Sequence, residues 1–105
     1  AINTDDDSGV PKVFALLGNY PNPFNPTTNI AFTMPHQGRV TMKLFDILGR
    51  TVSEVDFGNR TAGHHAVPFN ADRLSSGVYF YRLHLLDNRG AKTSSTLYGK
   101  MMVLK

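Results

Sequence analysis

The sequence predicts an all-β fold, an antiparallel sandwich or small barrel of about seven strands. The chain has 105 residues, 41% of them hydrophobic, which is enough for one core and too many for a disordered tail. Turn signals recur roughly every 8–12 residues, a spacing typical of sandwiches and small barrels. No segment repeats its apolar residues with the 3.6-residue period of a helix.

The chain divides into a short leading segment and one domain. Residues 1–12 are predicted to be the end of a linker, because they are polar, contain Asp5, Asp6 and Asp7 in a row, and carry Pro11. The domain itself is expected to cover residues 13–105, beginning with a short apolar segment.

A proline-rich stretch follows at residues 19–26. Pro21, Pro23 and Pro26 exclude a helix and cannot donate to a strand ladder, and each pushes the residue before it to extended angles. This stretch is therefore expected to form a stiff loop, with Tyr20 and Phe24 as its anchors in the core.

The remaining elements follow from alternation and turn residues. Asp46 to Arg50 predict a hairpin turn, with Asp at the first position and Gly49 in the left-handed position that closes it. Further turns are expected at residues 58–63, 74–77 and 87–90. Strands are expected at residues 30–34, 40–44, 51–57, 65–69, 78–83 (the strongest) and 96–105.

The apolar residues of these segments supply the predicted core. Its members are Phe14, Leu16, Tyr20, Phe24, Ile30, Phe32, Val40, Met42, Leu44, Val67, Phe69, Val78 and Phe80.

Charge and composition exclude several classes of protein. The net charge is +3, but no two of the eleven Lys and Arg residues are adjacent, which indicates a solvated surface and no nucleic-acid partner. The absence of Cys excludes thiol catalysis, disulfides and Cys-based zinc sites. No apolar run approaches the ~20 residues of a membrane span. No signal peptide opens the chain, so an export address is expected upstream or within the domain.

No metal site or cofactor is predicted. Counted from Asn3, the acidic run lacks the Gly and Glu positions of a calcium loop. His64 and His65 are neighbours and would face opposite sides of a strand, and His36 and His84 are distant in sequence. His65 is expected to pack at the edge of the core.

No catalytic residues are predicted either. The Ser75-Ser76-Gly77 run is a turn, without the pattern of a nucleophile elbow, and Glu54 is the only Glu. Three acids occupy turn positions, where Asp caps backbone N–H groups: Asp46, Asp72 and Asp87.

One aromatic run allows a second function. Tyr79 and Tyr81 share one face of the strongest strand, and Val78 and Phe80 share the other. Core packing is the favoured interpretation, but Tyr79, Tyr81 and Phe80 could instead form a platform for a sugar. The alternative function is then a retained cell-attachment or carbohydrate-binding module of a secreted enzyme.

Several motifs, in order, resemble one family. Residues 19–28 with the strand that follows resemble the opening of type A C-terminal sorting domains of the type IX (Por) secretion system. Residues 40–50, 62–65, 74–83 and 100–105 are similar to later parts of its pattern. The motif residues, expected to be mainly structural, are Asn19, Tyr20, Pro21, Asn22, Pro23, Phe24, Asn25, Pro26, Gly49, Gly77 and Tyr79.

The resemblance implies an immunoglobulin-like sandwich at the end of a larger secreted protein, covalently linked to an upstream cargo domain. It implies recognition by the type IX translocon, removal by a sortase-like peptidase, and a location in the periplasm and then at the outer-membrane surface or outside the cell. A similar sandwich occurs in the flagellar hook-cap protein, so fold alone does not set function.

The last strand is the part that the resemblance ties to export. The residues expected to meet the translocon are Lys100, Met101, Met102, Val103, Leu104 and Lys105. As a fold element this segment is a terminal strand, either buried on both faces or at an edge protected by Lys. A receptor can recognise such a strand by adding a strand to it or by binding its carboxylate, and an exposed terminal strand can also pair weakly with another copy.

Overall fold

The computed structural model describes residues 11–87 and 94–105, and within them it contains seven strands and no helix. The strands are β1 (Ala15–Tyr20), β2 (Thr27–Met34), β3 (Gly38–Phe45), β4 (Thr51–Arg60), β5 (Gly63–Asn70), β6 (Gly77–Asp87) and β7 (Ser94–Val103). This confirms the predicted all-β class and strand number. The acidic run at Asp5, Asp6 and Asp7 lies outside the described residues.

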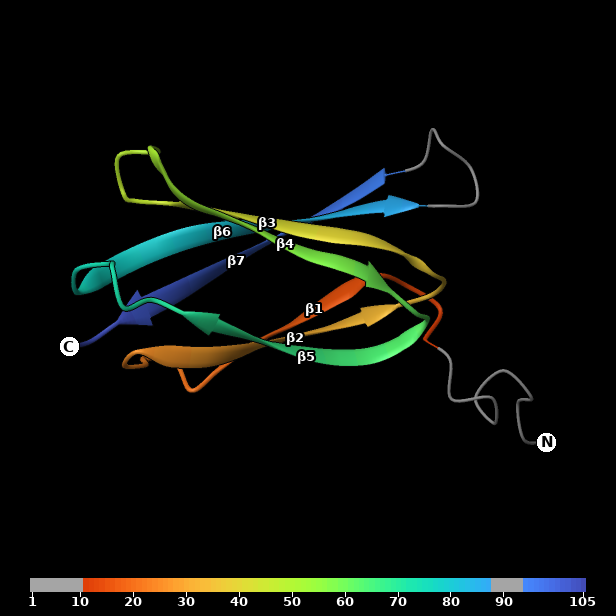
Figure 1. Cartoon of the computed structure of the whole chain (residues 1–105), viewed down its shortest axis with the longest axis horizontal. Coiled ribbons are helices and arrows are strands. Elements are labelled where there is room, and N and C mark those ends of the chain that lie inside the picture. Colours follow the sequence, from red (N-terminus) through yellow and green to blue (C-terminus); the bar gives the residue numbers. More distant parts are fainter. Residues whose placement is uncertain (1–10, 88–93) are drawn as a thin grey trace.

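The strands form two antiparallel sheets packed as the layers of a sandwich (Figure 1). The smaller sheet has the order β1-β2-β5 and the larger has the order β4-β3-β6-β7. No described helix is long and apolar enough to cross a bilayer.

Inward-facing side chains of both sheets make one core, as the alternation of β2, β3 and β5 predicts. Phe14 and Leu16, also predicted, are only partly buried and pack against it. The fully or nearly buried hydrophobic residues of the strands are Ile30, Phe32, Met34, Val40, Met42, Leu44, Val67, Phe69, Tyr79, Tyr81, Leu83, Leu85, Met101 and Val103.

The predicted face of β6 is wrong. Val78 is half-buried and Phe80 is exposed, whereas Tyr79 and Tyr81 are in the core. The physical reason lies further along the strand, where Arg82 shares the face of Phe80 and must stay near water. Of the three residues of the predicted sugar platform, both tyrosines are buried and only Phe80 is exposed, so they do not form a common platform.

Tyr20 is the third error in the predicted core. It lies at the end of β1 with 81% of its surface exposed, whereas Phe24 is 3% exposed and anchors the proline-rich stretch alone. The register shift between Leu16 and Gly18 is the reason, because it moves Tyr20 to the outer face, opposite the exposed Asn29.

The turn at the end of β4 also differs from the prediction. Gly58 and Asn59 belong to β4, and the strand register shifts there in a β-bulge. Gly58 has a φ of +77°, which suits a bulge, and its N–H donates to Asp56 Oδ1 at 2.8 Å. The sequence signal of a Gly was correct, but it marks a bulge and not a turn.

The hairpin between β3 and β4 has the predicted chemistry. Asp46 Oδ1 accepts hydrogen bonds from the N–H groups of Leu48 (2.9 Å) and Arg50 (3.0 Å), and Gly49 has a φ of +83°. In the connection between β5 and β6, Asp72 does not act as the cap: its N–H donates to Asn70 Oδ1 at 2.7 Å. The side chain of Asp87 is outside the described set.

Candidate functional site

Four segments far apart in sequence meet at one end of the sandwich (Figure 1). They are residues 21–26 between β1 and β2, residues 46–50 between β3 and β4, residues 71–76 between β5 and β6, and the end of β7. All four contain residues from the sequence motifs, so the fold brings the separate motifs together.

Phe24 pairs the proline-rich stretch with the end of β7. Its N–H donates to Met102 O at 3.0 Å, and its carbonyl accepts from Leu104 N at 3.0 Å. These bonds form a short parallel bridge between Phe24 and Val103, and both side chains are buried. The loop therefore acts as a small extra strand along the outer edge of β7.

Asn22 adds a side-chain contact to the same edge. Its Oδ1 accepts from Met102 N at 3.0 Å, and its Nδ2 is 3.4 Å from Lys100 O. Thr28 fixes the loop from behind, since its hydroxyl donates to Pro21 O at 2.7 Å and accepts from Asn19 Nδ2 at 3.2 Å. These contacts assign a structural role to Asn19 and Asn22, because the side chains of both residues hold the loop in place.

The end of β7 is consequently bonded on both edges. On the inner edge it pairs with the start of β6, where Tyr79 faces Met101 and Gly77 faces Val103. Asn22 and Phe24 occupy the outer edge. No further strand can be added at this stretch while they stay in place, so the strand-addition mode expected for residues 100–105 does not fit the folded domain.

The six residues expected to meet the translocon divide into two groups. Met101 and Val103 are fully buried in the core and cannot contact a partner. Lys100, Met102, Leu104 and Lys105 are exposed. A partner that binds the folded domain can reach only this second group.

Lys105 and Tyr79 secure the neighbouring connection. The backbone N–H of Lys105 donates to Ser76 Oγ at 2.9 Å, and its ammonium group donates to Asp72 O. The hydroxyl of Tyr79 donates to Ser75 O at 2.7 Å. The buried tyrosine thus fixes the turn before Gly77, where β6 begins.

Two adjoining hollows lie at this end, and Val78 lines both. One is also lined by Ile47, Leu48 and Arg73, and the other by Pro23, Lys100 and Met102. Val78 and Met102 are directly opposite each other in the β6–β7 ladder. We refer to the four apolar residues Ile47, Leu48, Val78 and Met102 as the end surface.

The end surface is apolar with basic neighbours. Ile47 and Leu48, on the hairpin tip, are 72% and 71% exposed. Arg50 is paired with Asp46 through an Nε–Oδ2 contact of 2.8 Å, whereas Arg73 forms no ion pair within residues 11–87 and 94–105. Sequence reasoning missed this surface. The available signal was a pair of large apolar residues in a turn, where polar residues are usual.

Hydrogen bonding controls the charge of the hairpin carboxylate. The backbone N–H of Arg50 lowers the pKa of Asp46 most, and the Leu48 N–H and the Arg50 guanidinium add to this effect. Asp46 therefore stays ionised and neutralises Arg50, so Arg73 and Lys100 carry the positive charge beside the end surface.

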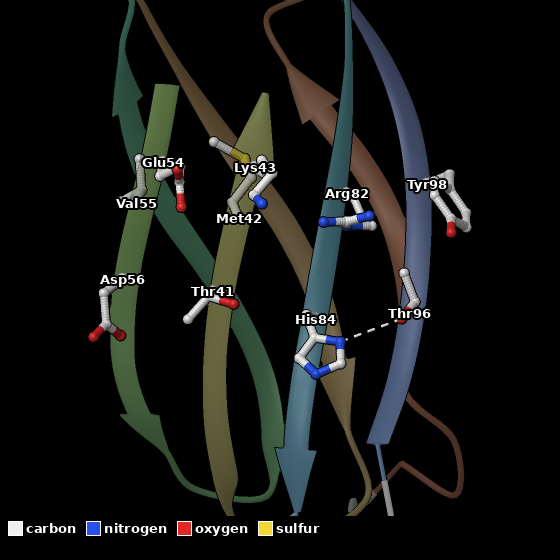
Figure 2. A pocket seen from close by; sticks show the side chains of 10 residues that line it. All are labelled: Thr41, Met42, Lys43, Glu54, Val55, Asp56, Arg82, His84, Thr96 and Tyr98. Carbon is white, nitrogen blue, oxygen red and sulfur yellow. Dashed lines mark hydrogen bonds between the residues drawn. The ribbon is translucent and has the colours of Figure 1, made fainter. Parts of the chain in front are cut away.

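A third hollow lies on the outer face of the larger sheet (Figure 2). Its polar residues have mixed charge, with Lys43 and Arg82 beside Glu54, and His84 Nδ1 lies 3.3 Å from Thr96 Oγ1. Figure 2 shows these side chains spread along four strands and not converging on one point. Within the described residues, no group of three or more His, Asp or Glu side chains is placed to hold a metal ion.

The adjacent histidines face opposite sides, as their alternation predicts. His64 is exposed. His65 packs at the edge of the core, stacked on Phe32 with ring centroids 5.5 Å apart, and its Nε2 donates to Thr61 O at 2.8 Å.

The fold and its motif-bearing end define a small antiparallel β-sandwich with a composite surface around its last strand. Residues 19–96 match the family model described as the secretion system C-terminal sorting domain. The chain therefore belongs to the family of type IX secretion C-terminal sorting domains. The matched range contains the proline-rich stretch and ends before residues 100–105.

A solved structure supports the fold independently. The crystal structure of dimeric latent PorU from Porphyromonas gingivalis is similar over 88% of this chain, with a TM-score of 0.69 and 16% sequence identity. The chain corresponds to 9% of the length of that protein, and at this identity the likeness shows the fold alone. No curated protein matches the chain.

Proposed function

We propose that this domain is the sorting signal of a covalently linked upstream cargo and directs it across the outer membrane by binding the type IX translocon. The observation that carries the proposal is the convergence of the family's separate motifs on the end of β7. The domain acts by binding and not by catalysis. In this proposal residues 1–12 are the linker that joins cargo to domain.

The proposed contact is the end surface together with Leu104 and Lys105. Ile47, Leu48 and Met102 are exposed in the described structure, and a patch of exposed apolar residues is typical of interaction sites. Arg73 and Lys100 supply positive charge beside it, so an apolar partner surface with acidic residues at its rim fits best. Met101, Val103 and Phe24 act beneath this surface as its support.

We further propose that a sortase-like peptidase removes the domain after export and anchors the cargo at the cell surface. Removal takes place upstream of β1, because a cut between Ala15 and Val103 would break the sandwich. The mass of the mature cargo tests this step: a cargo that retains the domain contradicts it.

A secretion assay tests the sorting role. Residues 1–105 are fused to the C-terminus of a fluorescent protein with a general export signal and expressed in a bacterium that has the type IX system. We expect fluorescence outside the outer membrane, lost when the translocon is deleted. A folded fusion that stays in the periplasm of the intact strain contradicts the proposal.

Surface variants separate recognition from folding. Removing residues 100–105 would also remove Met101 and Val103 from the core, so exposed positions are the better test. We expect Ile47→Ser with Met102→Ser to reduce export to the level of the translocon deletion while the thermal midpoint stays nearly unchanged. The matched control is Leu86→Ser with Tyr98→Ser, which changes exposed apolar residues away from the end surface. Equal export of the two double variants would exclude the end surface as the contact with the translocon.

A further inference from the structure

The two sheets have four edge strands, and three of them are protected against pairing. In β1 the register shifts between Leu16 and Gly18 in a bulge. β5 carries Pro68, which has no N–H to donate. β4 has register shifts and an ion pair between Asp56 and Arg39 of its neighbour. Bulges, prolines and charges are the usual means by which proteins block edge-to-edge association.

The fourth edge strand, β7, is protected over only part of its length. Asn22 and Phe24 cover its outer edge from Lys100 to Leu104. Residues 95–99 before this stretch contain no charge and no proline. Their pairing with β6 runs without a register shift, so no bulge interrupts this half of β7.

The backbone groups that this open half presents can be identified from the alternation of the ladder. Met102 directs its N–H and C=O away from β6, toward Asn22 and Phe24. In a regular antiparallel ladder every second residue does the same, so Thr96 and Tyr98 also direct these groups outward. Among residues 11–87 and 94–105, no backbone group is paired with them.

We propose that this open edge pairs with the same edge of a second copy of the chain, antiparallel, about a two-fold axis at Leu97. Thr96 then faces Tyr98 of the second copy, and Tyr98 faces Thr96 of the second copy. Each of these two pairs exchanges two backbone hydrogen bonds. The two larger sheets become one continuous sheet across the axis.

The side chains of the edge suit this arrangement. Tyr98, 72% exposed, comes beside a β-branched Thr, which is a favourable cross-strand combination. Lys100 comes opposite Ser94 of the second copy, so no two lysines oppose each other. Such a two-fold contact uses the same patch on both copies.

The contact is short, and the dimer is therefore weak. Five residues of edge on each side, 95–99, bury far less than the total of about 1,200 Å² that stable interfaces need. The dimer forms at high protein concentration and exchanges with monomer. This inference does not depend on the sorting role.

Sedimentation equilibrium and amide exchange of the whole chain test the proposal, from micromolar to millimolar concentration. We expect the average mass to rise from 11.6 kDa toward twice that value. Hydrogen exchange of the Thr96 and Tyr98 amides is expected to slow several-fold over the same range of protein concentration. Thr96→Lys is expected to keep the chain monomeric, because it puts a charge on the open edge.

Matched variants keep the test decisive. Thr51→Lys introduces the same change at an exposed Thr of β4, the opposite edge of the same sheet, and is expected to dimerise like the parent chain. Tyr98→Pro removes an N–H that points away from β6, together with the tyrosine ring, and is expected to abolish pairing. A chain that stays monomeric at millimolar concentration overturns the proposal, and so does a dimer that Thr96→Lys leaves intact.

Discussion

Asn22 and Met102 lie 80 positions apart, and a 3.0 Å hydrogen bond joins the side-chain oxygen of the first to the backbone N–H of the second. This contact connects the most unusual segment of the sequence, its proline-rich stretch, to the segment expected to meet the translocon. The stretch is thus a clamp on the last strand as well as a loop.

The clamp predicts local opening in an Asn22→Ala variant. Loss of the acceptor is expected to speed exchange of the Met102 amide and to lower the free energy of unfolding by about 0.5–1.5 kcal/mol. Asn22→Asp keeps the acceptor Oδ1 and is expected to protect Met102 better than Ala does. Native-state hydrogen exchange measures both. If the Met102 amide exchanges at the same rate in all three proteins, Asn22 does not clamp β7.

Phe24 is expected to provide most of the energy of the clamp. Because its ring is buried, Phe24→Ala should lower the free energy of unfolding by about 3–5 kcal/mol, a large share of the stability of a small domain. Tyr20→Ala, in the same stretch but exposed, should change it by less than about 0.5 kcal/mol. Urea unfolding of the two variants measures this contrast, and equal losses would refute the assignment of Phe24 as the single anchor.

The contrast between Phe24 and Tyr20 also shows what the sequence could predict. Strict alternation in β2, β3 and β5 identified their buried faces, because a half-buried strand needs that pattern. β6 is aromatic on both faces over Val78 to Tyr81, so a short window gave the wrong face. Arg82 and His84 would have corrected it, since they lie on the outer face with Phe80.

The candidate site was predictable only in part. The motif segments were recognisable one by one, but their meeting at one end depends on which strands are neighbours, and that is a long-range property. The pairing of Phe24 with Val103 leaves no local mark in either segment. The exposed pair Ile47 and Leu48 did leave a mark, as apolar residues in a turn.

Gly99 is expected to tolerate no side chain. A Cβ there would lie 2.4 Å from Cζ of Tyr81, whose ring is buried and has no room to move. Gly99→Ala should therefore lower the free energy of unfolding by about 1–3 kcal/mol or more through overpacking. Ser95→Ala, exposed on the same strand, is the control and should be nearly neutral.

A double-mutant cycle attributes this loss to the ring. In a Tyr81→Leu background, the further change Gly99→Ala should cost much less than it does in the parent chain. Urea unfolding of the four proteins gives the coupling energy. Additive losses would mean that Gly99 is required for a reason other than the Tyr81 ring.

The hairpin carboxylate predicts how stability depends on pH. Hydrogen bonds from the Arg50 N–H and its neighbours lower the pKa of Asp46 in the folded chain below the ordinary value of about 3.9. A group with a depressed folded pKa stabilises the fold above its unfolded pKa, and this contribution disappears as the pH falls through the folded value. Asp56, whose pKa Arg39 lowers, acts in the same direction.

Asp46→Asn is expected to remove the contribution of Asp46 to the dependence of the free energy of unfolding on pH. The variant should be less stable than the parent chain at neutral pH, because Asn lacks the charge that pairs with Arg50. The difference should begin to shrink as the pH falls below about 4, where the carboxylate of the unfolded chain takes up a proton, and should be lost below the lowered pKa of Asp46 in the folded chain. Urea unfolding at a series of pH values measures it, with Asp72→Asn as a control at an exposed turn position. A stability difference between parent and Asp46→Asn that stays constant from neutral pH to pH about 2 would show that the ionised carboxylate does not stabilise the hairpin.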